Sequence, residues 1–385
     1  MKNTTDMLFH IIRTALFAAP VQGGDEPLTV DAAKELLSLA KHHDLSHIVA
    51  NALLGMDDFS DLAPKLQPTV FKAIYRHEGQ AFELSRLREL LEAKGIPFVA
   101  LKGAVLRSYY PEPWMRTSCD IDILVKKEDI DRAKAEIMEE LGYEYRANSS
   151  HDITLFSQSG VCLELHFDLQ ESGFCELAEL NTVWDKGELR AKSAYEYEMT
   201  GELFLLYHIY HMAKHFINGG CGIKPLVDLW LIRNKMPLDE SRALAMLEEG
   251  GLLEFYKKSI ALCNVWFDGG AHDTTTREME EYILQGGVYG TLEQQLAMSQ
   301  SRKGGKGKHL MSKIFLPYRK MLIYYPSLQK APILYPIYQV RRWLRILFFG
   351  GSRRAFREVK LNQNLSLLKQ QKAQRLIDAL HLQNP

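Results

Sequence analysis

The stretch from Phe98 to Val125 constrains this chain most, because it places two carboxylates on one strand shortly after a glycine turn. An apolar, strand-like run over residues 97–101 leads into the turn Lys102-Gly103-Ala104, and the stretch ends in Asp120-Ile121-Asp122-Ile123-Leu124-Val125. Since side chains alternate along a strand, the two aspartates share one face and the two isoleucines the other. Carboxylates this close repel each other unless a cation lies between them or one takes up a proton. The pattern therefore predicts a metal site.

A third carboxylate is predicted on a second pair of strands. Ile153–Ser157 and Val161–Phe167 flank Gln158-Ser159-Gly160, which is typical of a β-hairpin with glycine in its turn. Alternation then places Glu164 and His166 on the same face of the second strand. The sequence thus predicts that this hairpin carries Glu164, with His166 as the candidate site histidine.

These parts suit the transfer of a phosphate-containing group. A turn that opens a helix at Gly103 directs backbone N–H groups at an anion, and glycine allows a phosphate to approach closely. Metal ions held by carboxylates bridge phosphate oxygens and neutralise developing charge. Lys102 and Arg116 could contact phosphate, or each could form a structural ion pair with a nearby acid. The residues alone leave both interpretations open.

With these motifs the chain resembles the DNA polymerase β-like nucleotidyltransferase superfamily, and more narrowly a bacterial family of uncharacterised nucleotidyltransferases. The resemblance lies in Leu101 to Ala104, Tyr110-Pro111, Arg116, Asp120 to Val125, and Glu164 to His166. It implies an α+β fold, in which a nucleotidyltransferase-like mixed β-sheet core with flanking helices is embedded in a largely α-helical chain.

The resemblance also implies roles for individual residues. Asp120 and Asp122 would bind Mg²⁺ (or Mn²⁺), Gly103 with Ala104 would contact nucleotide phosphates, and Glu164 would complete the metal site or activate the acceptor hydroxyl. The chain departs from the superfamily at Ala104, where serine or glycine is frequent, and at Glu164, which is longer than the usual aspartate. The candidate catalytic residues are therefore Asp120, Asp122 and Glu164, and the candidate nucleotide-binding residues are Lys102, Gly103, Ala104, Arg116 and His166.

The expected activity is metal-dependent transfer of a nucleoside monophosphate from an NTP to an unidentified acceptor hydroxyl or phosphate, with release of pyrophosphate. ATP is the expected nucleotide. The alternative is a catalytically idle nucleotide- or protein-binding module that retains the fold, such as a toxin/antitoxin-like partner. Ala104 and the lack of a recognisable acceptor pocket motivate this alternative. The three acids argue against it, because an idle site has no reason to hold repelling carboxylates together.

Changes in the hydrophobic period divide the chain into four predicted regions. Residues 1–94 form a helical N-terminal region, 95–175 the nucleotidyltransferase core, 176–300 a helical region that packs on the core, and 301–385 a basic, proline-interrupted helical region. In the third region His208, His211 and His215 share one helix face, where packed or hydrogen-bonded histidines are favoured over a metal site. Asp228 could pair with one of them or cap the preceding glycine loop.

Charge is distributed unevenly along the chain. Residues 302–385 carry 18 Lys and Arg against two acids, whereas residues 1–301 carry 29 basic and 46 acidic side chains, although the net charge of the whole chain is only -1. The basic part could bind nucleic acid through its phosphates, lie on an anionic membrane through residues 338–349, or pack against the acidic remainder of its own chain. The opposite charges of the two parts favour the last of these.

Composition indicates a cytoplasmic protein without a transmembrane segment. No apolar run approaches the roughly 18 to 20 residues that span a bilayer. Asp6, His10 and Arg13 interrupt the first residues where a signal peptide needs its apolar centre. The five cysteines are scattered without a Cys-x-x-Cys pair, so neither a disulfide framework nor a zinc site is predicted.

Overall fold

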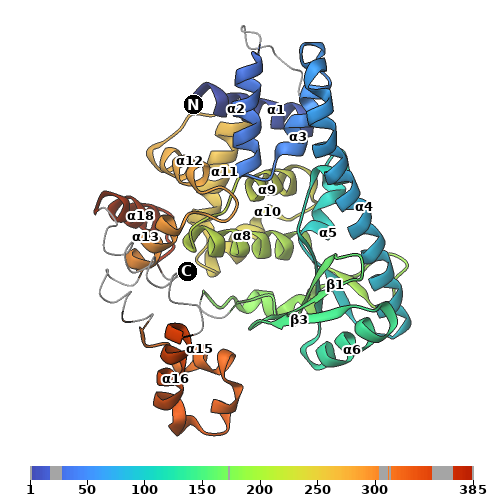
Figure 1. The fold of residues 1–385 in the computed structure, drawn as a ribbon, viewed down its shortest axis with the longest axis vertical. Helices are drawn as coiled ribbons and strands as arrows, with labels where there is room; N and C mark the ends of the chain where they lie inside the picture. The colour runs from blue at the N-terminus through green and yellow to red at the C-terminus, as the bar shows by residue number, and fades with distance from the viewer. Residues whose placement is uncertain are drawn as a thin grey trace.

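The computed structural model describes residues 2–17, 28–171, 174–302, 311, 314–348 and 367–383. One seven-stranded mixed sheet lies among many helices (Figure 1). This arrangement confirms the α+β fold with a mixed-sheet core and flanking helices. The division of the chain into four regions stays a prediction.

Four α-helices precede the sheet in the described part of the chain. They are α1 (Lys2–Phe17), α2 (Val30–His42), α3 (Ser46–Leu54) and α4 (Ala63–Ala93). The Thr29 hydroxyl accepts a hydrogen bond from the Ala32 N–H at 3.2 Å and so caps the start of α2. The long helix α4 has Pro64 in its first turn, where the missing N–H has no helical partner to lose.

The sheet has the strand order β3-β4-β5-β2-β1-β7-β6. Its strands are β1 (Phe98–Ala100), β2 (Asp120–Val125), β3 (Glu144–Asn148), β4 (Asp152–Phe156), β5 (Cys162–His166), β6 (Glu188–Leu189) and β7 (Glu196–Glu198). Strands β4 and β5 pair antiparallel, which confirms the predicted hairpin. Strand β5 pairs parallel with β2, so the two strands that carry the candidate acids are direct neighbours.

One face of the sheet is apolar and rests on two helices. Ile121 and Ile123 of β2 and Leu163 and Leu165 of β5 share a buried cluster with side chains of α4 and of α6 (Ile130–Leu141). Gly142 ends α6 in the left-handed conformation that favours glycine. Because the isoleucines of β2 lie in this core, the aspartates must face the other way.

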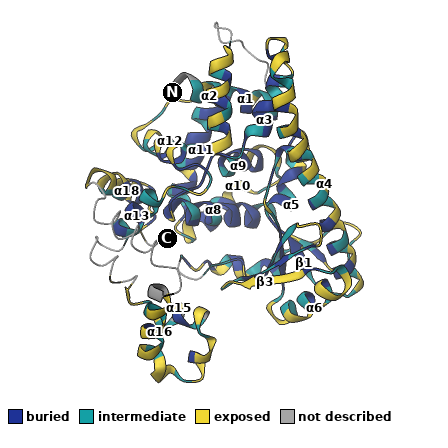
Figure 2. Ribbon diagram, in the orientation of Figure 1, coloured by how far each residue is buried: buried dark blue, intermediate teal, exposed yellow. Residues whose placement is uncertain are grey.

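The helices that follow the sheet share one apolar core with the N-terminal helices and with Val99 and Leu124 on the other face of the sheet. They are α8 (Gly201–Ile217), α9 (Lys224–Lys235), α10 (Glu240–Glu249), α11 (Leu253–Asp268), α12 (Thr274–Gly286) and α13 (Leu292–Arg302). The rings of Phe9 in α1 and Trp266 in α11 stack 4.2 Å apart. Figure 2 shows α8 buried along nearly its whole length, as expected for a helix at the centre of the molecule.

The described residues of the basic C-terminal part lie in two places. Helix α18 (Leu367–Ala379) packs on α12 and α13, where Lys372 lies 3.1 Å from Glu281 and Arg375 lies 2.7 Å from Glu278. These ion pairs follow the predicted attraction between the basic part and the acidic remainder. Helices α15 (Tyr318–Tyr324) and α16 (Tyr335–Phe348) instead project from the body of the molecule (Figure 1). Residue 349 of the predicted membrane segment lies outside the described residues.

None of the helices among the described residues is both long enough and apolar enough to cross a membrane.

Candidate functional site

Three neighbouring strands bring their polar side chains to one face of the sheet. In the register of the parallel pair, Asp122 of β2 lies opposite Glu164 of β5. In the register of the hairpin, Asp152 of β4 lies opposite His166 of β5. Since side chains alternate, all four point away from the apolar core beneath the sheet.

This polar face forms the floor of a cleft of about 500 Å³. Helices α8 and α9 contribute His211, Lys214, His215 and Lys224 to its walls. Seven of the eight candidate residues line the cleft, namely Lys102, Gly103, Arg116, Asp120, Asp122, Glu164 and His166. Ala104 does not. It lines a separate cavity of about 810 Å³.

Asp122 is held by two partners in the cleft. The Lys102 ammonium lies 2.8 Å from its Oδ1 atom, and Nε2 of His166 lies 3.0 Å from the same oxygen. Burial raises the pKa of Asp122, but the charge of Lys102 and the hydrogen bond from His166 outweigh burial and lower this pKa below its usual range. Burial lowers the pKa of His166, but its hydrogen bonds to Asp122 and Glu164 outweigh burial and raise this pKa above its usual value. Asp122 is therefore ionised and fixed in place.

Asp120 is in the opposite situation. Burial, together with the negative charges of Asp122 and Glu164, raises its pKa to about 6. Within the described part of the chain, no hydrogen bond or ion pair reaches its carboxylate. Asp120 thus presents oxygens that lack a positive partner next to an ionised neighbour, which is the arrangement that a divalent cation stabilises.

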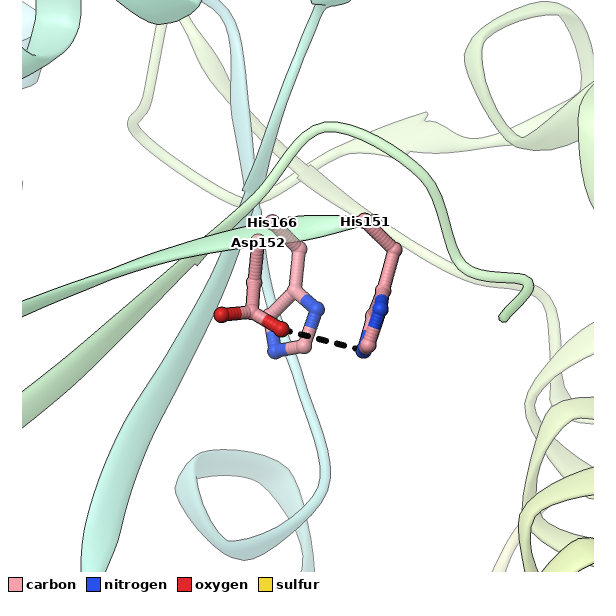
Figure 3. Close-up of side chains that lie close together, drawn as sticks. All are labelled: His151, Asp152 and His166. Atoms are coloured by element: carbon pink, nitrogen blue, oxygen red, sulfur yellow. Dashed lines mark ion pairs between the residues drawn. The ribbon is translucent and has the colours of Figure 1, made fainter. Parts of the chain in front are cut away.

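The sequence did not single out His151 and Asp152, which extend this polar face. Figure 3 shows them close to His166, with His151 Nε2 at 3.1 Å from Asp152 Oδ2. The same nitrogen lies 3.2 Å from Glu171, which also pairs with Lys214. Extending the predicted hairpin by its own register places residue 152 opposite residue 166. The sequence therefore held enough information to find Asp152.

The turn after β1 contains one residue with an unusual backbone conformation. The positive φ of 42° belongs to Lys102 and not to Gly103. A Cβ added at Gly103 would meet Ser118 at 3.5 Å, an ordinary contact, and the helix that follows, α5 (Gly103–Leu106), has only four residues. The backbone at Lys102 is strained, because residues with a side chain rarely adopt this conformation. This conformation accompanies the contact of its ammonium with Asp122.

Arg116 forms the structural ion pair that the sequence had left as one of two possibilities. Its Nε lies 2.8 Å from Asp228 Oδ1, and its Nη2 lies 2.8 Å from Oδ2. Tyr110 donates a further hydrogen bond to Asp228 at 2.7 Å. The expectation that Asp228 pairs with a histidine or caps the glycine loop is therefore wrong, because its carboxylate is occupied by Arg116 and Tyr110.

The three histidines of α8 are hydrogen-bonded, as predicted. His208 bonds the Pro225 carbonyl at 2.9 Å, and the Nε2 atoms of His211 and His215 lie 3.1 Å apart. Burial and the neighbouring Lys214 and Lys102 lower the pKa of His215 to about 4. His215 is thus neutral near pH 7, and it adds a polar but uncharged group to the wall opposite the acids.

From the raised pKa of Asp120 we predict how the metal-free protein's free energy of unfolding depends on this residue. In the presence of a chelator, Asp120→Asn should raise the free energy of unfolding near neutral pH by about 1 to 3 kcal/mol, because it removes a repelled charge. The folded-state pKa lies above the unfolded value, so wild-type stability falls as pH rises from about 4 through about 6. The gain should therefore vanish below pH about 4. Urea unfolding at several pH values measures it.

Asp44→Asn is the matched control for this stability experiment. Burial raises the pKa of Asp44, but Lys224 outweighs burial and lowers it, so this variant should lose stability at neutral pH. Added Mg²⁺ should cancel the advantage of Asp120→Asn, because only the wild type gains a cation. A less stable Asp120→Asn at neutral pH without metal would contradict the charge repulsion inferred from the cleft.

Comparison with known proteins adds a family match. A family model described as uncharacterised nucleotidyltransferase matches residues 31–268. Among solved structures, the chain is similar to that of the antibiotic-resistance factor ANT(2'')-Ia, with 12% identity and a TM-score of 0.34, over 48% of this chain and 96% of that chain. A TM-score this low adds nothing to the family match. The comparison with curated proteins gave no match.

Proposed function

The chain belongs to the uncharacterised nucleotidyltransferase family and is a nucleotidyltransferase, and on that premise we propose that it moves a nucleoside monophosphate from ATP to an acceptor hydroxyl or phosphate. Pyrophosphate is the second product. We further propose that the reaction depends on Mg²⁺ or Mn²⁺ and that the cleft above β2 and β5 is the active site.

The observation that carries this proposal is the carboxylate of Asp120. It has no positive partner among the described residues, and its pKa is raised by burial and by the acids beside it. Oxygen atoms are the ligands that Mg²⁺ prefers, so the donor set fits the ion. Asp120 and Asp122 would hold it. When bound, the ion would neutralise charge on the transferred phosphate group.

Glu164 is proposed as the third member of the metal site. A carboxylate oxygen of Glu164, an oxygen of Asp122 and a ring nitrogen of His166 all lie within 4.8 Å of one another. The half-buried Glu164 carboxylate also lies 3.6 Å from His166 Nε2. We propose that His166 orients Asp122 and Glu164, because it contacts both and is itself buried.

Lys102 and Gly103 are proposed to lie beside the nucleotide phosphates. Lys102 balances the charge of Asp122 in the metal-free cleft. With that charge balanced by a cation instead, the half-buried ammonium would be available to a phosphate oxygen. Lys214, His211 and His215 line the cleft across from the acids and would bound the space in which the triphosphate lies.

The position of Ala104 weakens the case for the alternative, a catalytically idle module. That alternative depended on the lack of a recognisable acceptor pocket and on Ala104, where a hydroxyl contact to phosphate would be missing. Ala104 lines a separate cavity, so the absence of a hydroxyl there says little about the cleft. The acceptor is not identified by any of the residues in the cleft.

Isothermal titration calorimetry tests the proposal. Purified wild type should bind ATP in the presence of Mg²⁺, and Asp120→Asn with Asp122→Asn should abolish this metal-dependent binding. Asp131→Asn is a matched control, because Asp131 is exposed on α6 and away from the cleft. Unchanged nucleotide binding in the double variant would rule out the proposed metal site. Labelled ATP incubated with cell extract should also label an acceptor, and only with the wild type and the control.

A further inference from the structure

Helix α16 exposes an apolar stripe where a surface helix normally exposes polar side chains. Ile337, Val340 and Leu344 are spaced by three and four residues, which places them on one face of the helix. Their exposed fractions are 63%, 47% and 49%, and Ile333 in the preceding turn is 87% exposed. We call these four residues the α16 stripe.

The orientation of α16 is fixed by polar contacts on its inner face. Gln339 is buried and donates from Nε2 to the Leu316 carbonyl at 2.5 Å. The Trp343 indole N–H donates to the Ile314 carbonyl at 2.8 Å. Because these two side chains point inward, the α16 stripe must point outward. Figure 2 shows mostly exposed residues on this projecting unit.

The charge around the stripe has a single sign. Residues 314–348 contain six Lys and Arg and no acid. Arg341 and Arg345 follow Ile337 at spacings that place them on the helix face next to the stripe, and both are exposed. The Arg341 guanidinium lies 5.9 Å from the ring centres of Tyr325 and Tyr338. An apolar face bordered by arginines and aromatic rings is typical of a helix that lies in a membrane interface.

We propose that α16 binds the surface of an anionic lipid bilayer, lying parallel to the membrane. The α16 stripe would enter the boundary between headgroups and acyl chains, and Arg341 and Arg345 would contact anionic headgroups. This inference does not depend on the proposed function of the cleft. It concerns an interaction surface outside the cleft that contains the acids.

Two other occupants of this surface fit less well. Nucleic acid would use the arginines and tyrosines but would leave the aliphatic stripe in water. A second copy of the chain would bring another wholly basic surface against this one, and like charges would oppose the contact. A bilayer with anionic lipids satisfies both the stripe and the charge.

Vesicle flotation with the full chain tests the proposal. Wild type should partition onto phosphatidylcholine vesicles that contain phosphatidylglycerol, and about tenfold less onto phosphatidylcholine alone. Ile337→Asp with Leu344→Asp should reduce partitioning onto the anionic vesicles by about tenfold or more, and Arg341→Glu with Arg345→Glu should do the same. These side chains are exposed, so the fold should survive, and circular dichroism checks this.

Helix α4 provides matched controls for both pairs of substitutions. Phe71→Asp with Tyr75→Asp introduces the same two charges in place of exposed apolar side chains, and Lys65→Glu with Lys72→Glu makes the same charge reversal at exposed positions. Both controls should stay within about twofold of wild type.

Several results would overturn the inference. These are no flotation, equal partitioning onto both kinds of vesicle, or equal loss in the α4 controls. Loss on arginine reversal without any loss on charging the stripe would also overturn it, since the helix would then not insert. Binding of an oligonucleotide without vesicle binding would assign the surface to nucleic acid. A dimer that the stripe variants dissociate, again without vesicle binding, would assign it to a second copy.

Discussion

Asp122→Asn is expected to slow nucleotidyl transfer by about a thousandfold, the largest effect of any single change in the cleft. Asp122 is ionised, buried and directly opposite Glu164 across the strand pair. Asparagine keeps its shape but removes the charge that would hold a divalent cation. It also removes the partner of Lys102 and His166. The initial rate at which label passes from ATP to an acceptor in cell extract, measured at saturating Mg²⁺, gives the size of the effect.

Glu196→Gln is the matched control for this experiment. Glu196 on β7 is also a buried carboxylate of the sheet, ion-paired with Arg88 and Arg190, and it lines the separate cavity instead of the cleft. Its loss should lower stability, while the rate per folded molecule should change by less than about threefold. If both variants lost activity equally, general damage to the sheet would explain the result and the role of Asp122 would not stand.

Local patterns were enough to predict the strands that carry the acids. The alternation of aspartate and isoleucine in β2 and the glycine turn before β5 depend only on neighbouring residues. The hairpin register then follows by counting from the turn, and it places Glu164 and His166 correctly. The folded sheet keeps the register predicted from these local patterns, because one buried face fixes the register of each strand.

Contacts between distant segments could not be predicted in the same way. Arg116 and Asp228 are 112 residues apart, and nothing local in either segment specifies the other. Helix α8 carries buried residues around almost its entire circumference, so the shared face of its histidines could not be told from packed core, and nothing local indicated that His211 and His215 face the acids. The positive φ of Lys102 accompanies its contact with Asp122, which also forms only in the folded chain.

The buried Arg116–Asp228 pair makes the prediction with the largest expected effect on stability. Arg116→Ala and Asp228→Ala should each lower the free energy of unfolding by about 3 to 5 kcal/mol, because each leaves an unpaired charge in the interior. Their side chains are only 12% and 1% exposed. Asp31→Ala is the control, because the Lys34–Asp31 pair is exposed and its loss should leave the free energy of unfolding nearly unchanged. Urea unfolding near neutral pH measures all three.

A paired replacement separates the structural role of Arg116 from a phosphate contact. Arg116→Met with Asp228→Leu removes both charges together and should recover most of the stability that either alanine variant loses, since hydrophobic residues of similar volume can replace a buried ion pair. If the guanidinium serves only Asp228, the paired variant should keep its affinity for ATP and Mg²⁺ within about threefold. A drop of about tenfold or more in a stable paired variant would show that Arg116 also contacts the nucleotide. Arg116 lines the cleft, but its guanidinium already holds Asp228 by two contacts. We therefore expect the paired variant to retain its affinity for ATP and Mg²⁺.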